Sequence, residues 1–173
     1  IWKWVLSPEY GAINNILALF GIEGPSWLQS SKWAMPAIVL ASVWKDMGYF
    51  GLMLMSGLQG INQEYYDAAA IDGAGKIKQF TRITLPLLTP TLFFVLIISL
   101  INSFQLFTQI MIMTPDGGPL GSTMVMVERI YKYGFRYYEM GPAASYSWIL
   151  FAILLLLTMV QMKLQNKWVN YDD

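Results

Sequence analysis

The sequence predicts an all-α membrane protein, a polytopic bundle of transmembrane helices. Of its 173 residues, 55% are hydrophobic and only 13% are charged, whereas soluble domains carry about 25% charge. The mean hydropathy is +0.45. Three stretches, at about 34–57, 87–110 and 143–164, are apolar and long enough to cross a bilayer. Together these observations indicate three membrane spans.

The composition also limits the chemistry of the chain. The net charge is zero, which argues against nucleic acid as a partner. Cysteine and histidine are absent, which removes the disulfide, the thiolate and the commonest general base and metal ligand. No Gly-x4-Gly-Lys-Ser/Thr segment occurs, so we expect no bound cofactor and no ATP in this chain by that route. The chain begins at Ile1, and we interpret it as a fragment or a processed chain.

Residues 1–33 contain tryptophan, proline and glycine in a mixed pattern. Residues 14–20 could form a short amphipathic helix at a membrane interface, or an ordinary surface loop. The first span, 34–57, would reach about 36 Å as a helix. Its small residues permit close helix packing: Gly48, Gly51, Ser56 and Gly57.

Lys45 and Asp46 are the charged residues of this first span. Neighbouring side chains on a helix point about 100° apart, so we predict that these two are not a mutual pair. They could form a gate or a charge in the cavity, or they could lie near the outer interface, which Lys45, about 11 residues from the start of the span, could reach with its long side chain.

A hydrophilic insert, 58–85, follows the first span. Asn62 can cap a helix, and Glu64 would lie in its first turn. Alanines have the highest helix propensity, and Gly73 is a natural stop, so we predict a helix near 63–72. Pro86 and Pro90 are expected to begin the second span, 87–110.

The rest of the chain is predicted from its turns and charges. Residues 114–119 form a turn cluster, and residues 120–141 carry charges among aromatics, which predicts a partly ordered loop. The third span, 143–164, is followed by a short tail at 165–173. Lysines and arginines number five on each side of the predicted spans, so charge alone does not orient the bundle.

The insert has a recognisable spacing. It resembles the loop of pattern E-A-A-x-x-x-G-x9-I-x-L-P in permease subunits of binding-protein-dependent ABC importers. The matching positions are Asp67, Ala68, Ala69, Gly73, Ile83, Leu85 and Pro86. One departure is that Asp67 stands where the pattern has glutamate.

Further segments resemble the sugar-type branch of these permeases, which serves maltose, multiple sugars and glycerol phosphate. The resemblance runs from about residue 5 to residue 165. Its segments are Trp44 to Gly48, Leu58 to Ile61, Asp72 to Ala74, Ser103-Phe104, Phe107, Thr114, Gly117 to Pro119, Ser122-Thr123, Ile130-Tyr131 and Phe135.

The resemblance implies the C-terminal portion of a type I importer permease, with the last three spans and a cytoplasmic coupling helix. Residues 1–33 would be the end of an upstream span and an extracytoplasmic loop, 34–164 the transmembrane domain, and 165–173 a cytoplasmic tail. The location would be the cytoplasmic (inner) membrane of a bacterium or archaeon.

The implied function is import of a sugar or sugar-like solute, without catalysis by this chain. The implied partners are a second permease subunit, expected to be a different chain, two ATP-binding subunits, an extracytoplasmic solute-binding protein, the sugar and the lipid bilayer. ATP and Mg would be held by the ATPase subunits.

The residues assigned to ATPase coupling share small size or a place in the pattern: Asp67, Ala68, Ala69, Ala70, Gly73, Ile83, Leu85 and Pro86. A small-sided helix can enter a cleft between ATPase lobes, and a capped helix is rigid enough to transmit a push. The competing interpretation is an alanine-rich but otherwise ordinary solvated helix.

Two polar faces are candidates for the translocation path. Ser99, Asn102, Ser103 and Leu106 recur at helical spacing in the second span, as do Ser42, Asp46 and Tyr49 in the first. Polar groups inside a membrane are costly unless they meet partners or a wet cavity. The related permeases place sugar contacts on these two helices. The alternative is that these groups hydrogen-bond between packed helices.

Two other functions remain as alternatives. A secondary transporter or channel subunit would work without an ATPase and would need no docking helix. A membrane-embedded enzyme could use Asp46 or Glu128 as an acid or base. The sequence does not name the solute.

Overall fold

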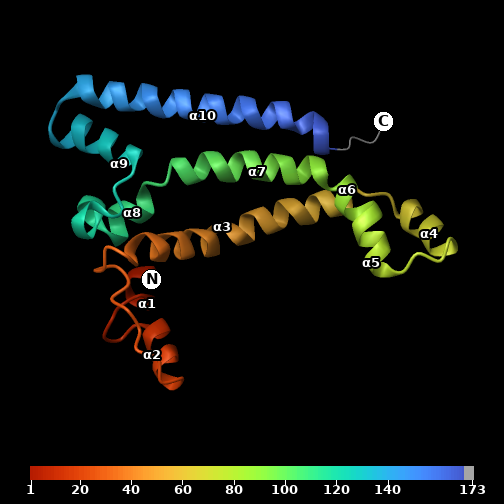
Figure 1. The fold of residues 1–173 in the computed structure, drawn as a ribbon, viewed down its shortest axis with the longest axis horizontal. Coiled ribbons are helices and arrows are strands. Elements are labelled where there is room, and N and C mark those ends of the chain that lie inside the picture. Colours follow the sequence, from red (N-terminus) through yellow and green to blue (C-terminus); the bar gives the residue numbers. More distant parts are fainter. Residues whose placement is uncertain (170–173) are drawn as a thin grey trace. The chain divides into compact units, whose positions relative to one another are not determined.

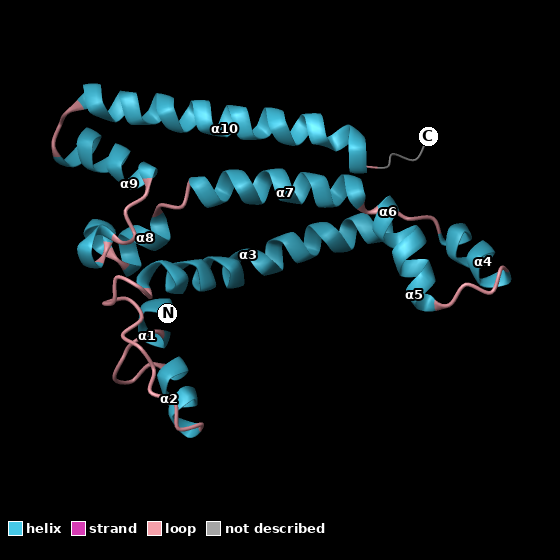
Figure 2. Ribbon diagram, in the orientation of Figure 1, coloured by secondary structure: helices cyan, strands magenta, loops and turns pink. Residues whose placement is uncertain are grey.

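The computed structural model describes residues 1–169, and helices and loops make up these residues without a β-strand (Figures 1 and 2). The predicted all-helical fold is confirmed. The α-helices are α1 (Trp2–Val5), α2 (Ala12–Leu19), α3 (Ala34–Gln59), α4 (Gln63–Ile71), α5 (Lys76–Gln79), α6 (Leu85–Leu87), α7 (Thr89–Phe104), α8 (Thr108–Met113), α9 (Met126–Tyr131) and α10 (Met140–Trp168). The π-helices are η1 (Phe80–Thr84) and η4 (Lys132–Arg136), and the 3-10 turns are η2 (Pro115–Gly117) and η3 (Pro119–Gly121).

Two of these helices are long and apolar enough to cross a membrane within the described part of the chain. They are α3, over Ala34–Gln59, and α10, over Met140–Gln165. Both stand where the sequence predicts spans, and each extends a few residues beyond the predicted limits.

The predicted second span, 87–110, is wrong in its limits. Helix α7 ends at Phe104, and α8 begins only at Thr108. On the other side, the helical path begins at Lys76, and the Lys76–Leu87 stretch meets α7 at a bend of 60°. This bent pair would be the third span.

Two prolines explain the bend at Leu88. Pro90 has no N–H to donate to the carbonyl of Pro86, and the hydroxyl of Thr89 donates to that carbonyl instead, at 2.6 Å. Just before Pro86, the chain widens into η1, where the N–H of Leu85 bonds back to Phe80. A wider turn relieves the clash between a proline ring and the preceding turn. Pro90 lies in the first turn of α7, as predicted, whereas Pro86 lies inside the helical stretch Lys76–Leu87 and does not begin it.

The chain forms two compact units. The first contains Ile1–Asp46 and Ser103–Ala152; the second contains Met47–Asn102 and the chain from Ile153 onward. The core of the first unit contains Leu6, Ala37, Ile38, Ala41, Ile110 and Met113. The alanines of α3 recur one helical turn apart, so other elements can pack close against that face.

The irregular segment before α3 is held by one side chain. The Asn14 amide donates to the carbonyls of Pro8 and Pro25, at 3.1 and 3.2 Å. The indole N–H of Trp27 donates to the Asn14 carbonyl oxygen at 2.6 Å. Helix α2 confirms the helix expected near residues 14–20. The membrane placement of residues 1–33 stays a prediction.

In the second unit, Gly57 is the small residue of α3 that permits close packing. A Cβ atom there would lie 2.5 Å from Oγ1 of Thr91 on α7. The same test at Gly48 and Gly51 meets no atom of the described chain within 4 Å. Of the glycines expected to serve close approach, Gly57 therefore does so within this chain.

Candidate coupling site and translocation path

Helix α4 stands where the sequence predicts it and has the expected ends. The side chain of Asn62 accepts a hydrogen bond from the N–H of Glu64 at 3.1 Å, which caps the first turn. At the other end, Gly73 adopts φ +74. The N–H groups of Gly73 and Ala74 bond to the carbonyls of Ala70 and Ala69, at 3.0 and 2.8 Å. This pair of bonds is a Schellman ending, which glycine favours.

One face of α4 is tied to the helix that follows it. The hydroxyl of Tyr66 lies 2.9 Å from Oγ1 of Thr84, and Thr84 is buried. Ala69 is half-buried, one turn further along α4. The structure thereby brings the two halves of the insert together, because Thr84 lies between Ile83 and Leu85 of the same pattern.

The remaining faces of α4 are exposed, and small side chains lie there among larger ones: Glu64 is exposed and Tyr65 is 44% exposed. Asp67, Ala68 and Ala70 are exposed, and Ile71 is 87% exposed. The Asp67 carboxylate accepts a hydrogen bond from the Gln63 amide of the same helix, at 3.2 Å. The exposed alanines therefore lie beside two larger exposed side chains, Tyr65 and Ile71, on a short, capped helix.

The second half of the pattern is helical. Ile83 belongs to η1, and Leu85 and Pro86 belong to α6. Ile83 and Pro86 are half-buried and Leu85 is exposed. The hydrophilic insert, 58–85, therefore contains the predicted helix α4 and a second helical segment that begins at Lys76.

The path candidates on α3 make local contacts. The Ser42 hydroxyl donates to the carbonyl of Ile38, one turn earlier, at 2.8 Å. Asp46 forms an ion pair with Lys45 at 3.2 Å. The expectation that these neighbours would not pair is therefore wrong: long side chains can bend toward each other across the 100° between their positions. Tyr49 is exposed and its ring contacts that of Phe50.

Three path candidates of the predicted second span, Ser99, Asn102 and Ser103, lie on α7, which ends at Phe104. The Ser99 hydroxyl donates to the carbonyl of Leu96 at 3.0 Å, and Asn102 and Ser103 are exposed. Leu106 was expected on the same helical face. It lies beyond the end of α7 and packs against the core of the first unit. Residues 105–107 include no glycine or proline, so no local sequence signal marks the end of α7. The end of the helix coincides instead with the packing of Leu106 against the core.

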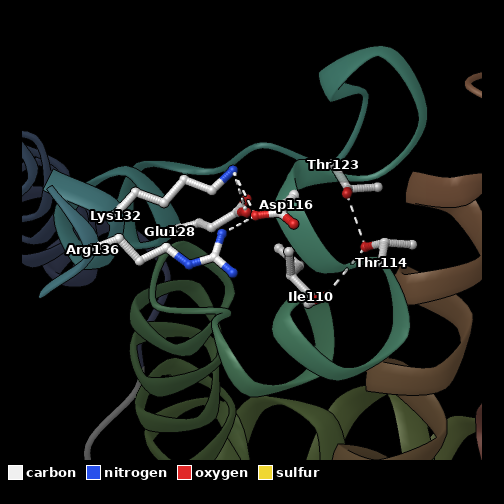
Figure 3. Close-up of polar contacts among 7 residues, drawn as sticks. All are labelled: Ile110, Thr114, Asp116, Thr123, Glu128, Lys132 and Arg136. Atoms are coloured by element: carbon white, nitrogen blue, oxygen red, sulfur yellow. Dashed lines mark hydrogen bonds and ion pairs between the residues drawn. The ribbon is translucent and has the colours of Figure 1, made fainter.

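Sequence reasoning missed a cluster of charges outside the candidate site (Figure 3). Residues 120–141 were expected to be a partly ordered loop, but they contain α9 and η4. Lys132 pairs with Glu128 at 3.2 Å and with Asp116 at 3.7 Å, and Arg136 also pairs with Asp116. Glu128 is 4% exposed. The i, i+4 spacing of Glu128 and Lys132 was the available signal.

The comparisons with known proteins agree with the fold. Residues 4–170 match the family model described as "Binding-protein-dependent transport system inner membrane component". The chain is 37% identical over 164 residues to the sulfoquinovosyl glycerol transport system permease protein SmoG of Agrobacterium fabrum, covering 95% of this chain and 53% of that protein. It is 35% identical to the sn-glycerol-3-phosphate transport system permease protein UgpA of Shigella flexneri, covering 99% of this chain and 58% of the relative.

A solved structure shares the fold. A chain of a bacterial ABC transporter involved in the import of the acidic polysaccharide alginate superposes with a TM-score of 0.83 at 23% identity, covering 96% of this chain and 58% of that one. The chain thus spans little more than half the length of the proteins it matches. On the strength of the family match and these relatives, the chain belongs to the inner membrane permease components of binding-protein-dependent transport systems.

Proposed function

We propose that this chain forms part of a permease subunit of an ATP-driven importer and that α4 couples it to an ATPase subunit. The observation that carries the proposal is the pair of exposed alanines, Ala68 and Ala70, on a helix capped at both ends. The alanines allow the backbone of α4 to approach a cleft closely, and the exposed side chains of Tyr65 and Ile71 can contact the cleft walls.

The contact between Tyr66 and Thr84 supplies the route for motion. A push on α4 would reach η1 through this hydrogen bond and then pass along α6 into α7. Since helices are stiff over a few turns, a displacement of α4 would shift the start of α7. Coupling therefore needs both the exposed face and the tie beneath it.

The remaining partners follow from this role. Two ATPase subunits would hold ATP and Mg, a second permease subunit would complete the path, and an extracytoplasmic solute-binding protein would deliver the solute. The chain would lie in the cytoplasmic membrane of a bacterium or archaeon, with α4 on the cytoplasmic side. The predicted cytoplasmic tail, 165–173, lies partly outside the described residues.

The solute is proposed to be a sugar or a sugar-like polyol derivative. Two relatives are named for hydroxyl-rich solutes, sulfoquinovosyl glycerol and sn-glycerol-3-phosphate. Asn102 fits such a solute, since it is exposed and its amide has no hydrogen-bond partner among the described residues. An amide can both donate to and accept from a hydroxyl.

Ala68→Trp tests the coupling role in the complete transport complex. The bulk would stand on the exposed face of α4 and leave the Tyr66–Thr84 contact in place, so we expect loss of transport and of solute-stimulated ATPase activity. Ile16→Trp, on the exposed surface of α2, is the matched control. Full stimulation in an assembled Ala68→Trp complex would exclude α4 as the docking element. Transport without ATPase subunits would favour a secondary transporter.

A further inference from the structure

A small cavity lies beside the ion pairs of Figure 3, within the first unit. Its volume is about 90 Å³, and a molecule of liquid water occupies about 30 Å³, so the space holds roughly three water molecules. Phe107 and Tyr131 form its apolar side, with their ring centroids 5.1 Å apart. The charged residues that line it are Asp116, Glu128, Lys132 and Arg136. A cavity that combines aromatic rings with a few convergent charged groups has the composition of a small-molecule site.

Two cations of one helical segment meet at a single oxygen atom. The guanidinium of Arg136 pairs with Oδ1 of Asp116, and the ammonium of Lys132 lies 3.7 Å from the same atom (Figure 3). Lys132 and Arg136 are the two ends of η4, about one helical turn apart, so they project from the same side of the segment. The point between them is therefore a position for an anion, and the Asp116 carboxylate occupies it.

The buried carboxylate of Glu128 holds one of these cations in place. Glu128 is 4% exposed, and its Oε1 pairs with Lys132 at 3.2 Å. Its Oε2 is buried and makes no hydrogen bond among the described residues. Since an unpaired buried carboxylate is costly, Lys132 is expected to stay beside Glu128 whether or not Asp116 is there. An ammonium has three N–H groups, so Lys132 can hold Glu128 and a second anion at once.

The carboxylate of Asp116 is the weakly held part of the cluster. Its side chain is 61% exposed and comes from the η2 turn. The Arg136 side chain is 52% exposed, and an exposed ion pair contributes little stability. Moving the Asp116 carboxylate from the cations into water therefore costs little. Two cations and the carboxylate of Glu128 then remain around the cavity, and their net charge of +1 suits one anionic group.

We propose that this cavity binds the anionic group of an acidic sugar or polyol, which takes the place of the Asp116 carboxylate between Lys132 and Arg136. A carboxylate, sulfonate or phosphate can accept hydrogen bonds from the guanidinium fork and from the ammonium together. The carbon atoms next to that group would pack against Phe107 and Tyr131. A space of about 90 Å³ takes this charged end of the solute, and the rest would extend outward past the exposed side chains.

This inference rests on the proposed function and narrows its solute class. Helix α7 separates the cavity from α4 along the chain. An importer with α4 in the cytoplasm would therefore present the cavity to the incoming solute, before the solute reaches the candidate path on α7.

Binding of two matched sugars tests the charge requirement. D-Glucuronate and D-glucose differ at one carbon, which carries a carboxylate in the first and a hydroxymethyl group in the second. Their dissociation constants would be measured by saturation-transfer NMR with the complete permease–ATPase complex in phosphatidylcholine nanodiscs, without the binding protein, whose own sugar site would interfere. Glucuronate should bind more tightly than glucose, and added salt should weaken the binding of glucuronate alone. Equal dissociation constants for the two sugars would overturn the anion site.

Two variants of the same ion pair should act in opposite directions. Arg136→Gln removes one cation and should raise the dissociation constant of glucuronate by roughly 3- to 10-fold, between the effects of an exposed and a buried charged contact. Asp116→Asn removes the competing carboxylate and should lower that constant, and asparagine tolerates the φ of +62 at this position. Arg129→Gln is the matched control, because Arg129 is exposed and lies over the ring of Tyr146, outside the cavity. Weaker binding in both Asp116→Asn and Arg136→Gln, or an equal loss in Arg129→Gln, would refute the exchange of Asp116 for a solute anion.

The ATPase activity of the same preparation separates this proposal from the proposed function. Stimulation by the solute-loaded binding protein, without preferential binding of glucuronate, would overturn the anion site and leave the permease role standing. Preferential binding of glucuronate that follows the variants, without any stimulation, would support the anion site and count against the importer role.

Discussion

The hydroxyl of Tyr66 lies 2.9 Å from Oγ1 of Thr84, which joins α4 to the helical stretch leading into α7. This contact connects the two segments of the insert that match the permease pattern, through side chains that the pattern itself does not include.

Removing this hydrogen bond should loosen coupling. Tyr66→Phe keeps the ring but removes the hydroxyl, at a cost of about 0.5–1.5 kcal/mol. We expect fewer solute molecules transported per ATP hydrolysed, measured with the complex in proteoliposomes. Thr84→Val should have the same effect, and the double variant should add little, because both remove one bond. An unchanged ratio in both single variants would show that force does not pass through this contact.

The contact between Gly57 and Thr91 should be sensitive to a single methyl group. Gly57→Ala would place Cβ 2.5 Å from the Thr91 hydroxyl oxygen, and such overpacking costs about 1–3 kcal/mol. We expect a lower melting temperature of the purified complex. Gly48→Ala is the matched control, since the same helix has open space there, and alanine has a higher helix propensity. Equal melting temperatures for both variants would contradict the close approach.

Breaking the Glu128–Lys132 pair should destabilise the first unit. Lys132→Met leaves the carboxylate of Glu128, 4% exposed, without its cation, and removing one partner of a buried pair costs about 3–5 kcal/mol. Adding Glu128→Gln should recover part of this loss, since no buried charge then remains. Arg136→Gln should change stability by less than about 1 kcal/mol, because its ion pair with Asp116 is exposed. Thermal unfolding of the complex checks all three, and a larger loss in the double variant than in Lys132→Met would refute the pairing.

Asn102 should affect solute preference more than assembly. Its side chain is exposed and has no hydrogen-bond partner among the described residues, so Asn102→Leu removes no bond that holds this chain together. If it lines the path, losing a contact to a solute hydroxyl should cost about 1–3 kcal/mol, or roughly 5- to 150-fold in affinity. Competition among several sugars in a transport assay measures solute preference, and the yield of assembled complex measures assembly. Together the two measurements separate a role in the path from a role in helix packing. Reduced yield with unchanged preference would instead assign Asn102 to helix packing against a partner.

Local sequence signals predicted the elements that depend on local physics. Asn62 and Gly73 marked both ends of α4, and long uncharged stretches marked α3 and α10. The same reasoning failed where distant parts of the chain decide the structure. The end of α7 at Phe104 has no local breaker, and it accompanies the packing of Leu106 into the core.

Local sequence signals were also insufficient for the charged segment 120–141 and for Pro86. Residues 120–141 appeared loop-like because charges lay among aromatics, but Glu128 is buried against Lys132, and this burial supports a helix. Pro86 was expected to begin a helix, since proline suits the first turn. A π-helical turn accommodates it inside the helix instead. The coupling role of the residues picked out by the spacing stays a prediction, and the Tyr66–Thr84 hydrogen bond could be found only from the structure.

The hydroxyl of Thr89, at 2.6 Å from the carbonyl of Pro86, has a consequence for hydration of the bent span. A proline bend leaves a carbonyl oxygen without its backbone donor, and in an apolar surrounding such an oxygen attracts water. Because Thr89 satisfies it from within the same helix, the bend can tilt α7 without recruiting a water molecule. The start of α7 can therefore be angled and dry at once.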